Sequence, residues 1–156
     1  MKKEIQTEAK ASTRELISFL IGTQEFCVDI MAVREIRGWS QATPLPHAPD
    51  FVQGMINLRG VVLPIIDMSA RLGIAAGDVA NRRVIIVVWI GSRMIGLLVD
   101  AVCDILTVGD DLLQPTPEVS NKTIGKYVSA VLTVDERMVC LIALEHLLPE
   151  LDVAAA

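Results

Sequence analysis

Hydrophobic positions in this chain fall into short runs of Val, Ile and Leu that are separated by Gly, Pro, Asp and Asn. Short apolar runs rich in β-branched residues, with turn formers between them, are typical of β-strands. The segment Ala32–Arg37 fits either a short helical turn or a bent strand. The pattern predicts β structure at Leu16–Ile21, Phe26–Ile30, both arms of 54–66, Val84–Leu106, Val128–Val134 and Met138–Ile142. A turn-rich loop is expected over Gly109–Lys126, and one or two amphipathic turns over Ala143–Leu151.

The segment Asn57-Leu58-Arg59-Gly60 lies between two apolar arms and predicts a tight β-hairpin. Arg59 would stand at its tip, either as a contact for a partner or as a solvated turn charge. Asp67 follows the second arm and can cap a short helix that ends at Gly73. Three prolines over 44–49 predict an extended connector before the hairpin.

The first hairpin has a matching copy 69 residues further along the chain. At this offset Gly22-Thr23 matches Gly91-Ser92, Val33 matches Val102, and Glu35-Ile36 matches Asp104-Ile105. Two alternating hairpins align at some offset by chance, but a shared V-x-[E/D]-I after a matched glycine turn is more specific. We therefore expect two similar small β subdomains packed side by side. Short strands with little helix favour barrels over a βαβ sheet.

These patterns predict a mainly all-β protein with short helices. One domain is expected over 14–151, made of two intertwined β-barrel subdomains at about 14–80 and 81–151. Residues 1–13 and 152–156 are expected to be a flexible lead and a flexible tail. A chain of 156 residues is long enough to bury roughly 70% of its unfolded surface without disulfide or metal staples.

Composition narrows the function. The chain is 52% hydrophobic but only 4% aromatic, and its net charge is −5 without a basic cluster, which argues against nucleic acid as a partner. Met1–Ser12 has no apolar signal core, and the longest uninterrupted apolar run, Val84–Ile90, is far short of a membrane span. We expect a soluble, cytosolic protein with no direct membrane insertion.

Catalytic and metal-binding patterns are scarce. The sequence has no G-x-S-x-G elbow, no Walker loop, no G-x-G-x-x-G and no C-x-x-C pair. The two histidines, His47 and His146, have no nearby ligand partners, so neither a metal nor another cofactor is expected. The three cysteines, Cys27, Cys103 and Cys140, stand in apolar runs and are expected to be buried, reduced thiols.

Two other classes of function stay open at this point. One is a small hydrolase or transferase that uses Cys103 or Glu35 with a histidine. The other is a small-molecule-binding β-barrel with an enclosed apolar pocket. Glu35, Asp67, Asp100 and Asp104 otherwise suit caps, turns and surface ion pairs.

Features suited to a protein interaction are richer. Val33 and Ile36 are three residues apart, as are Val102 and Ile105. At a junction between two barrels these four could line an apolar groove for the apolar face of a partner helix, or they could be ordinary core residues. Arg59 could pair with Glu35 beside that groove.

Several motifs together resemble the CheW family, the adaptors that couple bacterial chemoreceptors to the histidine kinase CheA. The resemblance runs from about Glu15 to Leu148. The motifs are Pro44-x-Pro46-x-x-Pro49, Gly54-x-Ile56-Asn57-Leu58-Arg59-Gly60, Leu63-Pro64-Ile65-Ile66-Asp67, Arg71-Leu72-Gly73 and Gly96-x-x-Val99-Asp100-x-Val102.

The resemblance implies two five-stranded SH3-like β-barrels and a non-enzymatic role in chemotaxis signal transduction. One surface would bind the CheW-like regulatory domain of the kinase, and a groove between the barrels would bind the receptor's cytoplasmic hairpin tip. The length leaves no room for a kinase or receiver domain, so a stand-alone adaptor, recruited to membrane-associated receptor arrays, is expected.

The resemblance also implies particular site residues. Glu35 and Arg59 match a family ion pair, and Glu118 and Val119 match a contact with the kinase's regulatory domain that closes rings. Val119 departs from the aromatic residue usual there, and Ser69 from the larger residue usual after Asp67. The positions that match the receptor-contact region are Val33, Glu35, Ile36, Gly54, Arg59, Val84, Gly96, Val102 and Ile105.

Overall fold

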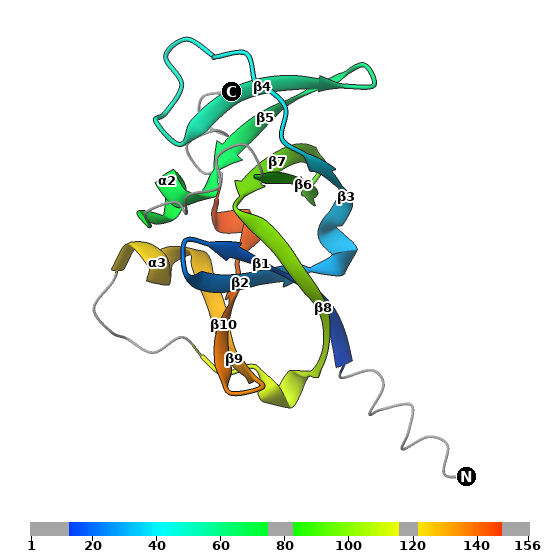
Figure 1. The fold of residues 1–156 in the computed structure, drawn as a ribbon, viewed down its shortest axis with the longest axis vertical. Helices are drawn as coiled ribbons and strands as arrows, with labels where there is room; N and C mark the ends of the chain where they lie inside the picture. The colour runs from blue at the N-terminus through cyan, green and yellow to red at the C-terminus, as the bar shows by residue number, and fades with distance from the viewer. Residues whose placement is uncertain (1–12, 75–82, 116–121, 148–156) are drawn as a thin grey trace.

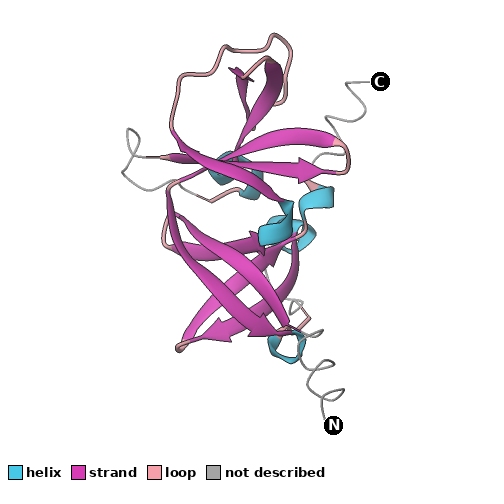
Figure 2. Ribbon diagram, turned by 90° about the vertical axis from the view of Figure 1, so that its right-hand side faces the viewer, coloured by secondary structure: helices cyan, strands magenta, loops and turns pink. Residues whose placement is uncertain are grey.

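The computed structural model describes residues 13–74, 83–115 and 122–147 and shows a mainly β protein (Figure 1). Its strands form two five-stranded sheets. The first, barrel A, has the order β8-β1-β2-β10-β9, and the second, barrel B, has the order β3-β6-β7-β5-β4. Figure 2 shows the two barrels stacked end to end, with most of the short helices near their junction and one at the far end of barrel A. The expected all-β class with two five-stranded barrels is confirmed.

The strands of barrel A are β1 (Thr13–Ile21), β2 (Gln24–Asp29), β8 (Ala101–Gly109), β9 (Val128–Val134) and β10 (Arg137–Ile142). Those of barrel B are β3 (Val33–Gly38), β4 (Val52–Leu58), β5 (Val61–Asp67), β6 (Val84–Ile90) and β7 (Arg93–Val99). Short helices lie between them: η1 (Ile30–Ala32), α2 (Met68–Leu72), η3 (Asp110–Leu112), α3 (Lys122–Tyr127) and η4 (Leu144–His146).

The expected division of the two subdomains near residue 80 does not separate the two sheets. Barrel B is one continuous stretch from β3 to β7, and it is inserted between the two parts of barrel A. The chain crosses between barrels at η1 and again at Asp100. The sheets are completed by the parallel pairs β2–β10 and β5–β7, which are contacts between chain segments that a sequence pattern does not reveal.

The internal repeat is confirmed by the strand register. Ile36 pairs with Ile86 on β6, and its counterpart Ile105 pairs with Ile17 on β1. A register shift interrupts both pairings at equivalent places, between Val33 and Glu35 in barrel B and between Ile17 and Phe19 in barrel A. The two barrels are thus structural copies of each other.

Each sheet is closed into a barrel by one isolated bridge between its edges. Beyond β3, the Thr43 amide donates to the Met55 carbonyl of β4 at 2.9 Å, and the Met55 amide donates back at 2.8 Å. Beyond β8, Gln114 and Val131 of β9 exchange bonds of 2.9 and 2.8 Å in the same way. The two barrels are therefore closed by equivalent pairs of backbone hydrogen bonds.

Apolar side chains fill three regions. One cluster lies inside barrel A around Leu16 and Leu132, and another lies inside barrel B around Leu63 and Ile85. The largest cluster, which includes Phe19 and other side chains from both barrels, joins the two. Successive side chains of a strand point to opposite faces of the sheet. Apolar residues on one face therefore fill the barrel interior, and those on the other face form the interface between the barrels.

The predicted local features are confirmed. The Arg59-Gly60 turn has φ angles of +51° and +89°, as a two-residue type I′ hairpin requires. The Asp67 side chain accepts the Ser69 amide at the start of α2, and Gly73 ends this helix with a φ of +72°. The Ala32–Arg37 segment is mainly strand, since β3 begins at Val33 directly after η1.

Two expectations were wrong in part. The turn-rich loop over Gly109–Lys126 contains η3 and most of α3. The cysteines are not all buried, because Cys103 is exposed on β8 and Cys140 is half-buried, whereas Cys27 is buried. Cys103 lies on an edge strand, where an apolar run is covered on one side only. Among the described residues, no helix is long and apolar enough to cross a membrane.

Candidate docking surface between the barrels

The edge strands β3 and β8 each begin where the chain crosses between the two barrels, and they carry the four repeated apolar residues. Val33 and Val102 are half-buried against the shared core. Ile36 and Ile105 are 43% and 61% exposed. Val84, at the start of β6, also packs on the shared core while staying partly exposed. We call these five residues the seam surface.

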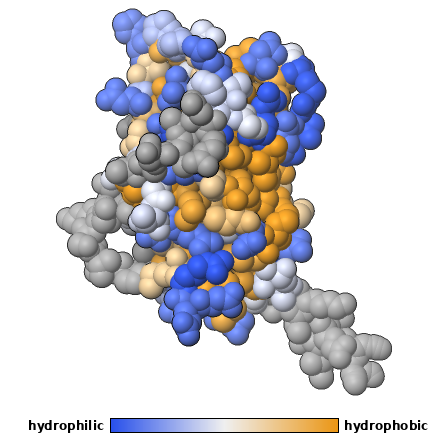
Figure 3. All heavy atoms as spheres, in the orientation of Figure 1, coloured by the Kyte–Doolittle hydropathy of each residue, from blue (hydrophilic) through white to orange (hydrophobic). Residues whose placement is uncertain are grey.

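Apolar side chains also gather at the middle of the molecule. Figure 3 shows a band of apolar side chains across the waist of the molecule, between more hydrophilic ends. Exposed apolar patches of this kind, rimmed by polar residues, mark interaction sites in soluble proteins. An amphipathic helix has an apolar stripe that could cover such a band.

Arg59 and Glu35 are brought together as expected. Arg59 Nη2 donates a hydrogen bond to Glu35 Oε1, and the Nη1 atom of Arg37 lies 3.8 Å from the other carboxylate oxygen. The hydrogen bond from Arg59 lowers the pKa of Glu35, and the positive charges of Arg59, Arg34 and Arg37 act in the same direction. Glu35 is therefore a fixed carboxylate, unsuited to act as a general acid near neutral pH.

Gly54 and Gly96 are buried, and neighbouring groups occupy the space where a Cβ would lie. A Cβ on Gly54, whose φ is +152°, would lie 2.5 Å from the Thr43 carbonyl oxygen. A Cβ on Gly96 would lie 2.4 Å from Ile65 Cδ1. Gly54 thus permits the bridge that closes barrel B, and Gly96 permits the close packing of β7 against β5.

Glu118 and Val119, the residues expected at a kinase and ring interface, lie outside the described residues. The next element along the chain is α3. The sequence reading also missed three large exposed side chains near the junction: Met31 on η1 is 86% exposed, and Trp39 and Trp89 are 42% and 43% exposed. The chain has only 4% aromatic residues, and both of its tryptophans are partly exposed. Since tryptophan is enriched at interaction sites, its rarity in this sequence could have marked these two positions as candidates.

The thiols do not form a nucleophilic site in the described part of the chain. Burial raises the pKa of the Cys27 thiol to about 12. Burial also raises the pKa of Cys140, and it raises that of Cys103 together with the nearby charges of Glu25 and Asp104. A raised pKa keeps a thiol protonated and inert. Both histidines are exposed, and His146 contacts the Lys126 carbonyl at 3.3 Å.

Metal and small-molecule sites gain no support from the described residues. No group of three or more His, Cys, Asp or Glu side chains among them could hold a metal ion. The interiors of both barrels are filled by their own apolar clusters, so the enclosed pocket of a ligand-binding barrel does not form there. A surface pocket of about 350 Å³ lies at the junction of the barrels.

The CheW-like domain family matches residues 15–152 of this chain, which is nearly its whole length. The chain belongs to the CheW family. It is 56% identical over 143 residues to the probable chemotaxis protein CheW of Rhizobium etli, covering 92% of each chain. It is 35% identical over 141 residues to the chemotaxis protein CheW of Klebsiella aerogenes, covering 90% of this chain and 85% of the relative.

The fold agrees with this membership. The crystal structure of the scaffolding protein TtCheW from Thermoanaerobacter tengcongensis matches with a TM-score of 0.81 and 29% sequence identity. The match covers 87% of this chain and 92% of TtCheW. This CheW-family protein is accordingly a chemotaxis scaffold and not an enzyme, and the hydrolase and small-molecule-barrel alternatives are set aside.

Proposed function

We propose that this protein couples the cytoplasmic hairpin tip of methyl-accepting chemoreceptors to the regulatory domain of a CheA-type histidine kinase. It works in the cytoplasm and is recruited to membrane-associated arrays by the receptors it binds. Holding both partners on one scaffold raises their effective concentration and fixes their relative geometry without any chemical step.

The observation that carries the receptor half of this proposal is the exposure of Ile36 and Ile105 on the equivalent edge strands β3 and β8 of the two barrels. Both are large aliphatic side chains on rigid β structure, and both stand beside side chains of the shared core. A helix that lays its apolar stripe between them would bury them at little entropic cost, because the strands are already ordered.

The ion pair at the end of this surface supports specificity. Arg59 and Glu35 hold each other in position, so a polar group on the bound helix meets a fixed charge arrangement. An exposed pair of this kind contributes only about 0–1 kcal/mol to stability, so its value lies in orientation and in the rejection of wrong partners. The proposed receptor site includes Gly54, Gly96 and Val84 as well, the two glycines through the backbone positions they allow.

The kinase half rests on the family resemblance. Glu118 and Val119 are the residues we propose to contact the kinase's regulatory domain, which has the same two-barrel fold in this family. Since Val119 is not aromatic, we expect this contact to bury less apolar surface than an aromatic residue would allow.

The test is binding to a purified receptor cytoplasmic fragment, with and without the kinase, measured by co-sedimentation or calorimetry. Ile105→Ala should weaken receptor binding roughly tenfold, which corresponds to about 1.4 kcal/mol. Its melting temperature should change little, because the side chain is 61% exposed. Met138→Ala is the matched control, since Met138 is 58% exposed on β10 of barrel A.

Receptor binding and kinase binding can be tested with separate variants. Ile105→Ala should leave kinase binding unchanged, whereas Glu118→Arg should weaken kinase binding and leave receptor binding unchanged. Normal receptor binding by both Ile105→Ala and Ile36→Ala would refute the seam as the receptor site.

A further inference from the structure

Two arginines share the carboxylate of Glu35. Arg59 Nη2 donates a hydrogen bond to Glu35 Oε1, and Arg37 Nη1 lies 3.8 Å from Glu35 Oε2. Among the described residues, neither guanidinium lies within ion-pair distance of another carboxylate. Two guanidinium groups and one carboxylate leave one positive charge uncompensated. We call Glu35, Arg37 and Arg59 the charged trio.

This positive charge is accessible at Arg59. The Arg59 side chain is 60% exposed, compared with 34% for Arg37. Glu35 is the one acceptor that the Arg59 side chain has in the described part of the chain, so its other guanidinium N–H groups can donate to an acceptor from outside. Because a guanidinium presents its donors in a fixed fork, one arginine can bind two carboxylates at once.

Arg37 supplies the second positive charge from the strand itself. It stands two residues after Glu35 on β3, so the two side chains share a face of the sheet. The hydrogen bond from Arg59 is the largest cause that lowers the pKa of Glu35, and the positive charges of Arg59, Arg34 and Arg37 add to it. Without Arg37 the Arg59–Glu35 pair would be neutral, and an incoming carboxylate would give it a net negative charge.

The equivalent corner of barrel A lacks these arginines. At the offset of 69 residues, Asp104 corresponds to Glu35 and Leu106 corresponds to Arg37. The turn between β9 and β10 is Asp135-Glu136, with φ angles of +49° and +69°, and it takes the place of the Arg59-Gly60 turn between β4 and β5.

One arginine is present at the barrel A corner, and carboxylates surround it. Arg137 Nε lies 2.6 Å from the buried Glu25 Oε1. Arg137 Nη2 and Nη1 each lie 3.9 Å from a carboxylate oxygen, of Asp104 and of Asp135 respectively. Acidic groups therefore outnumber the cation there. Of the two equivalent corners, the one at Arg59 attracts an anion.

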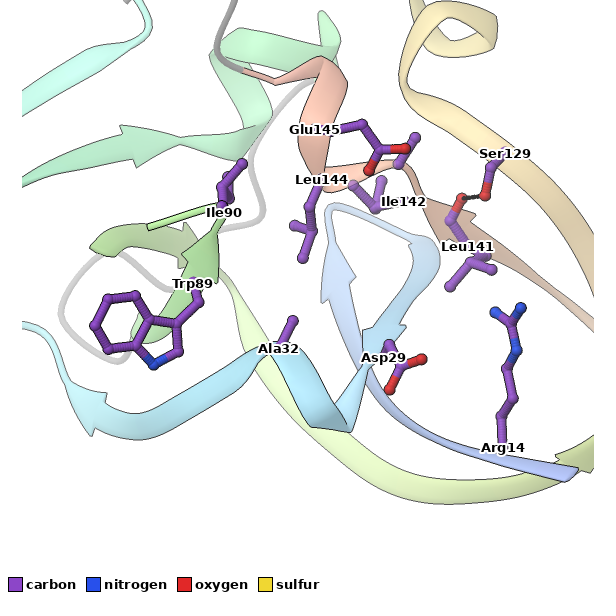
Figure 4. A pocket seen from close by; sticks show the side chains of 12 residues that line it. Arg14, Asp29, Ala32, Trp89, Ile90, Ser129, Leu141, Ile142, Leu144 and Glu145 are labelled. Atoms are coloured by element: carbon purple, nitrogen blue, oxygen red, sulfur yellow. Dashed lines mark hydrogen bonds between the residues drawn. The ribbon is translucent and has the colours of Figure 1, made fainter. Parts of the chain in front are cut away.

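The pocket at the junction does not attract an anion either. Figure 4 shows the side chains of Asp29 and Glu145 in its lining, with Arg14 at one end. Arg14 is already paired with Asp110 across 3.2 Å. The lining therefore has an excess of negative charge, and an incoming carboxylate is directed to the charged trio.

We propose that Arg59 binds an Asp or Glu side chain of the docked receptor helix while it stays bonded to Glu35, and that Arg37 compensates this second carboxylate. The inference rests on the proposed receptor-binding function and names the partner's chemistry at one end of the seam surface. Arg37 does not touch the partner and acts through Glu35 as a positioning residue. The incoming carboxylate brings the charged trio to neutrality, so no excess charge is covered in the complex.

The test is binding to the purified receptor cytoplasmic fragment, measured by calorimetry at low and high salt. Arg37→Gln should weaken binding about fivefold at low salt and less at high salt, because salt screens exposed charges. Arg37→Lys keeps the charge and should bind nearly as the unsubstituted protein does. Lys126→Gln is the control: it removes one positive charge from α3, which lies on the other side of the molecule from β3 (Figure 1), and should leave binding unchanged.

The double variant Glu35→Gln/Arg37→Gln separates charge balance from structure. It leaves Arg59 as an uncompensated cation, so it should bind the fragment more tightly than Arg37→Gln alone. If Arg37 only supports the fold, the second substitution cannot restore binding. Fragments in which the Asp and Glu residues of the hairpin tip are changed one at a time to Asn or Gln locate the partner carboxylate, since with one of them Arg37→Gln should no longer weaken binding.

Three results would overturn the inference: no loss of binding in Arg37→Gln, a double variant that binds no more tightly than Arg37→Gln, or an equal Arg37→Gln loss with every fragment. Failure of the proposed function looks different. If Ile36→Ala and Ile105→Ala also bind normally, the receptor site itself is wrong. If those two variants bind weakly while Arg37→Gln binds normally, only the role of Arg37 is wrong.

Discussion

At the scale of single residues, some positions of the proposed site have exposed charged side chains, whereas others are buried glycines. Arg59 and Glu35 form an ion pair at the end of the seam surface, on a turn that requires positive φ at Arg59. Gly54 and Gly96 belong to the same proposed site but are buried. Their contribution is the space that a missing side chain leaves.

Arg59→Ala should raise the pKa of Glu35 towards its ordinary value of about 4.3, since the hydrogen bond from Arg59 is the largest cause of its lowering. A lowered folded-state pKa stabilises the fold above the unfolded pKa, and this contribution is lost as the pH falls through the folded value. The variant should therefore lose part of the acid dependence of stability. NMR titration of the Glu35 carboxyl carbon measures the change, and an unchanged pKa would show that the pair does not form in solution.

Thiol labelling of the native protein at neutral pH should find no fast-reacting cysteine. Cys27 should be unreactive, since it is buried and its pKa is raised to about 12. Cys103 should react first because it is exposed, yet more slowly than a free thiol because its own pKa is raised. Mass spectrometry of native and unfolded protein gives the order, and a rapid, low-pKa thiol would reopen the question of nucleophilic chemistry.

At the scale of elements, the two sheets have one open edge each, and these edges carry the proposed docking surface. Strands β3 and β8 are edges with half-covered apolar faces, and both carry a register shift close to the seam residues. Such irregularities bend an edge strand and protect it from pairing with other chains. The far edges are covered by the Thr43–Met55 and Gln114–Val131 bridges, so each barrel is closed on that side.

Gly54→Ala should destabilise the protein by about 3 kcal/mol, because an alanine at this φ is strained and its Cβ would collide with the backbone of Thr43. The barrel B bridge would have to open. Urea unfolding gives the free energy of unfolding, and Gly38→Ala is the matched control because nothing lies within 4 Å of its Cβ position. Gly38→Ala should change that free energy by less than about 0.5 kcal/mol. Equal effects of the two variants would mean that the bridge is not important for stability.

At the scale of the whole molecule, the two barrels form one body through their shared apolar cluster and a buried ion network. Arg83 joins Asp67, at the end of β5, to Asp100, where the chain crosses from barrel B back to barrel A. The Asp100 amide also donates to the Leu20 carbonyl of β1 at 2.9 Å. On the side of α2 and α3, the Arg71 guanidinium is stacked between the rings of Phe51 and Tyr127, at 4.0 and 4.7 Å from their centroids.

Arg83→Met should lower the free energy of unfolding by about 3 kcal/mol, because it removes a guanidinium that lies 3.5 Å from the nearly buried Asp100 carboxylate and 3.0 Å from Asp67. Arg14 stands 69 residues before Arg83, at the matching position of the repeat, and it pairs with Asp110 in solvent. Arg14→Met should therefore cost at most about 1 kcal/mol. Denaturant unfolding of both variants compares the two sites directly. A similar loss in the two would contradict the view that burial makes the Arg83 contacts more important for stability than the exposed Arg14–Asp110 pair.

Much of this architecture follows from local sequence chemistry. The Arg59-Gly60 hairpin, the Asp67 cap and the Gly73 stop each depend on backbone preferences of a few neighbouring residues, and all three were predictable. The repeat was also predictable, since matched residues such as Val33 and Val102 have matched environments. The scaffold role in chemotaxis was predictable from the family motifs, and the docking surface stays a prediction that rests on the repeat and the hairpin.

Only the tertiary structure decided how these parts are joined. The parallel pairs β2–β10 and β5–β7 put barrel B between two parts of barrel A, because strands far apart in sequence meet when their apolar faces share a core. The exposure of Cys103 and Ile105 likewise depends on which strands become edges. The sequence determines each residue's preferences, and the packing of distant segments decides which of them face a partner.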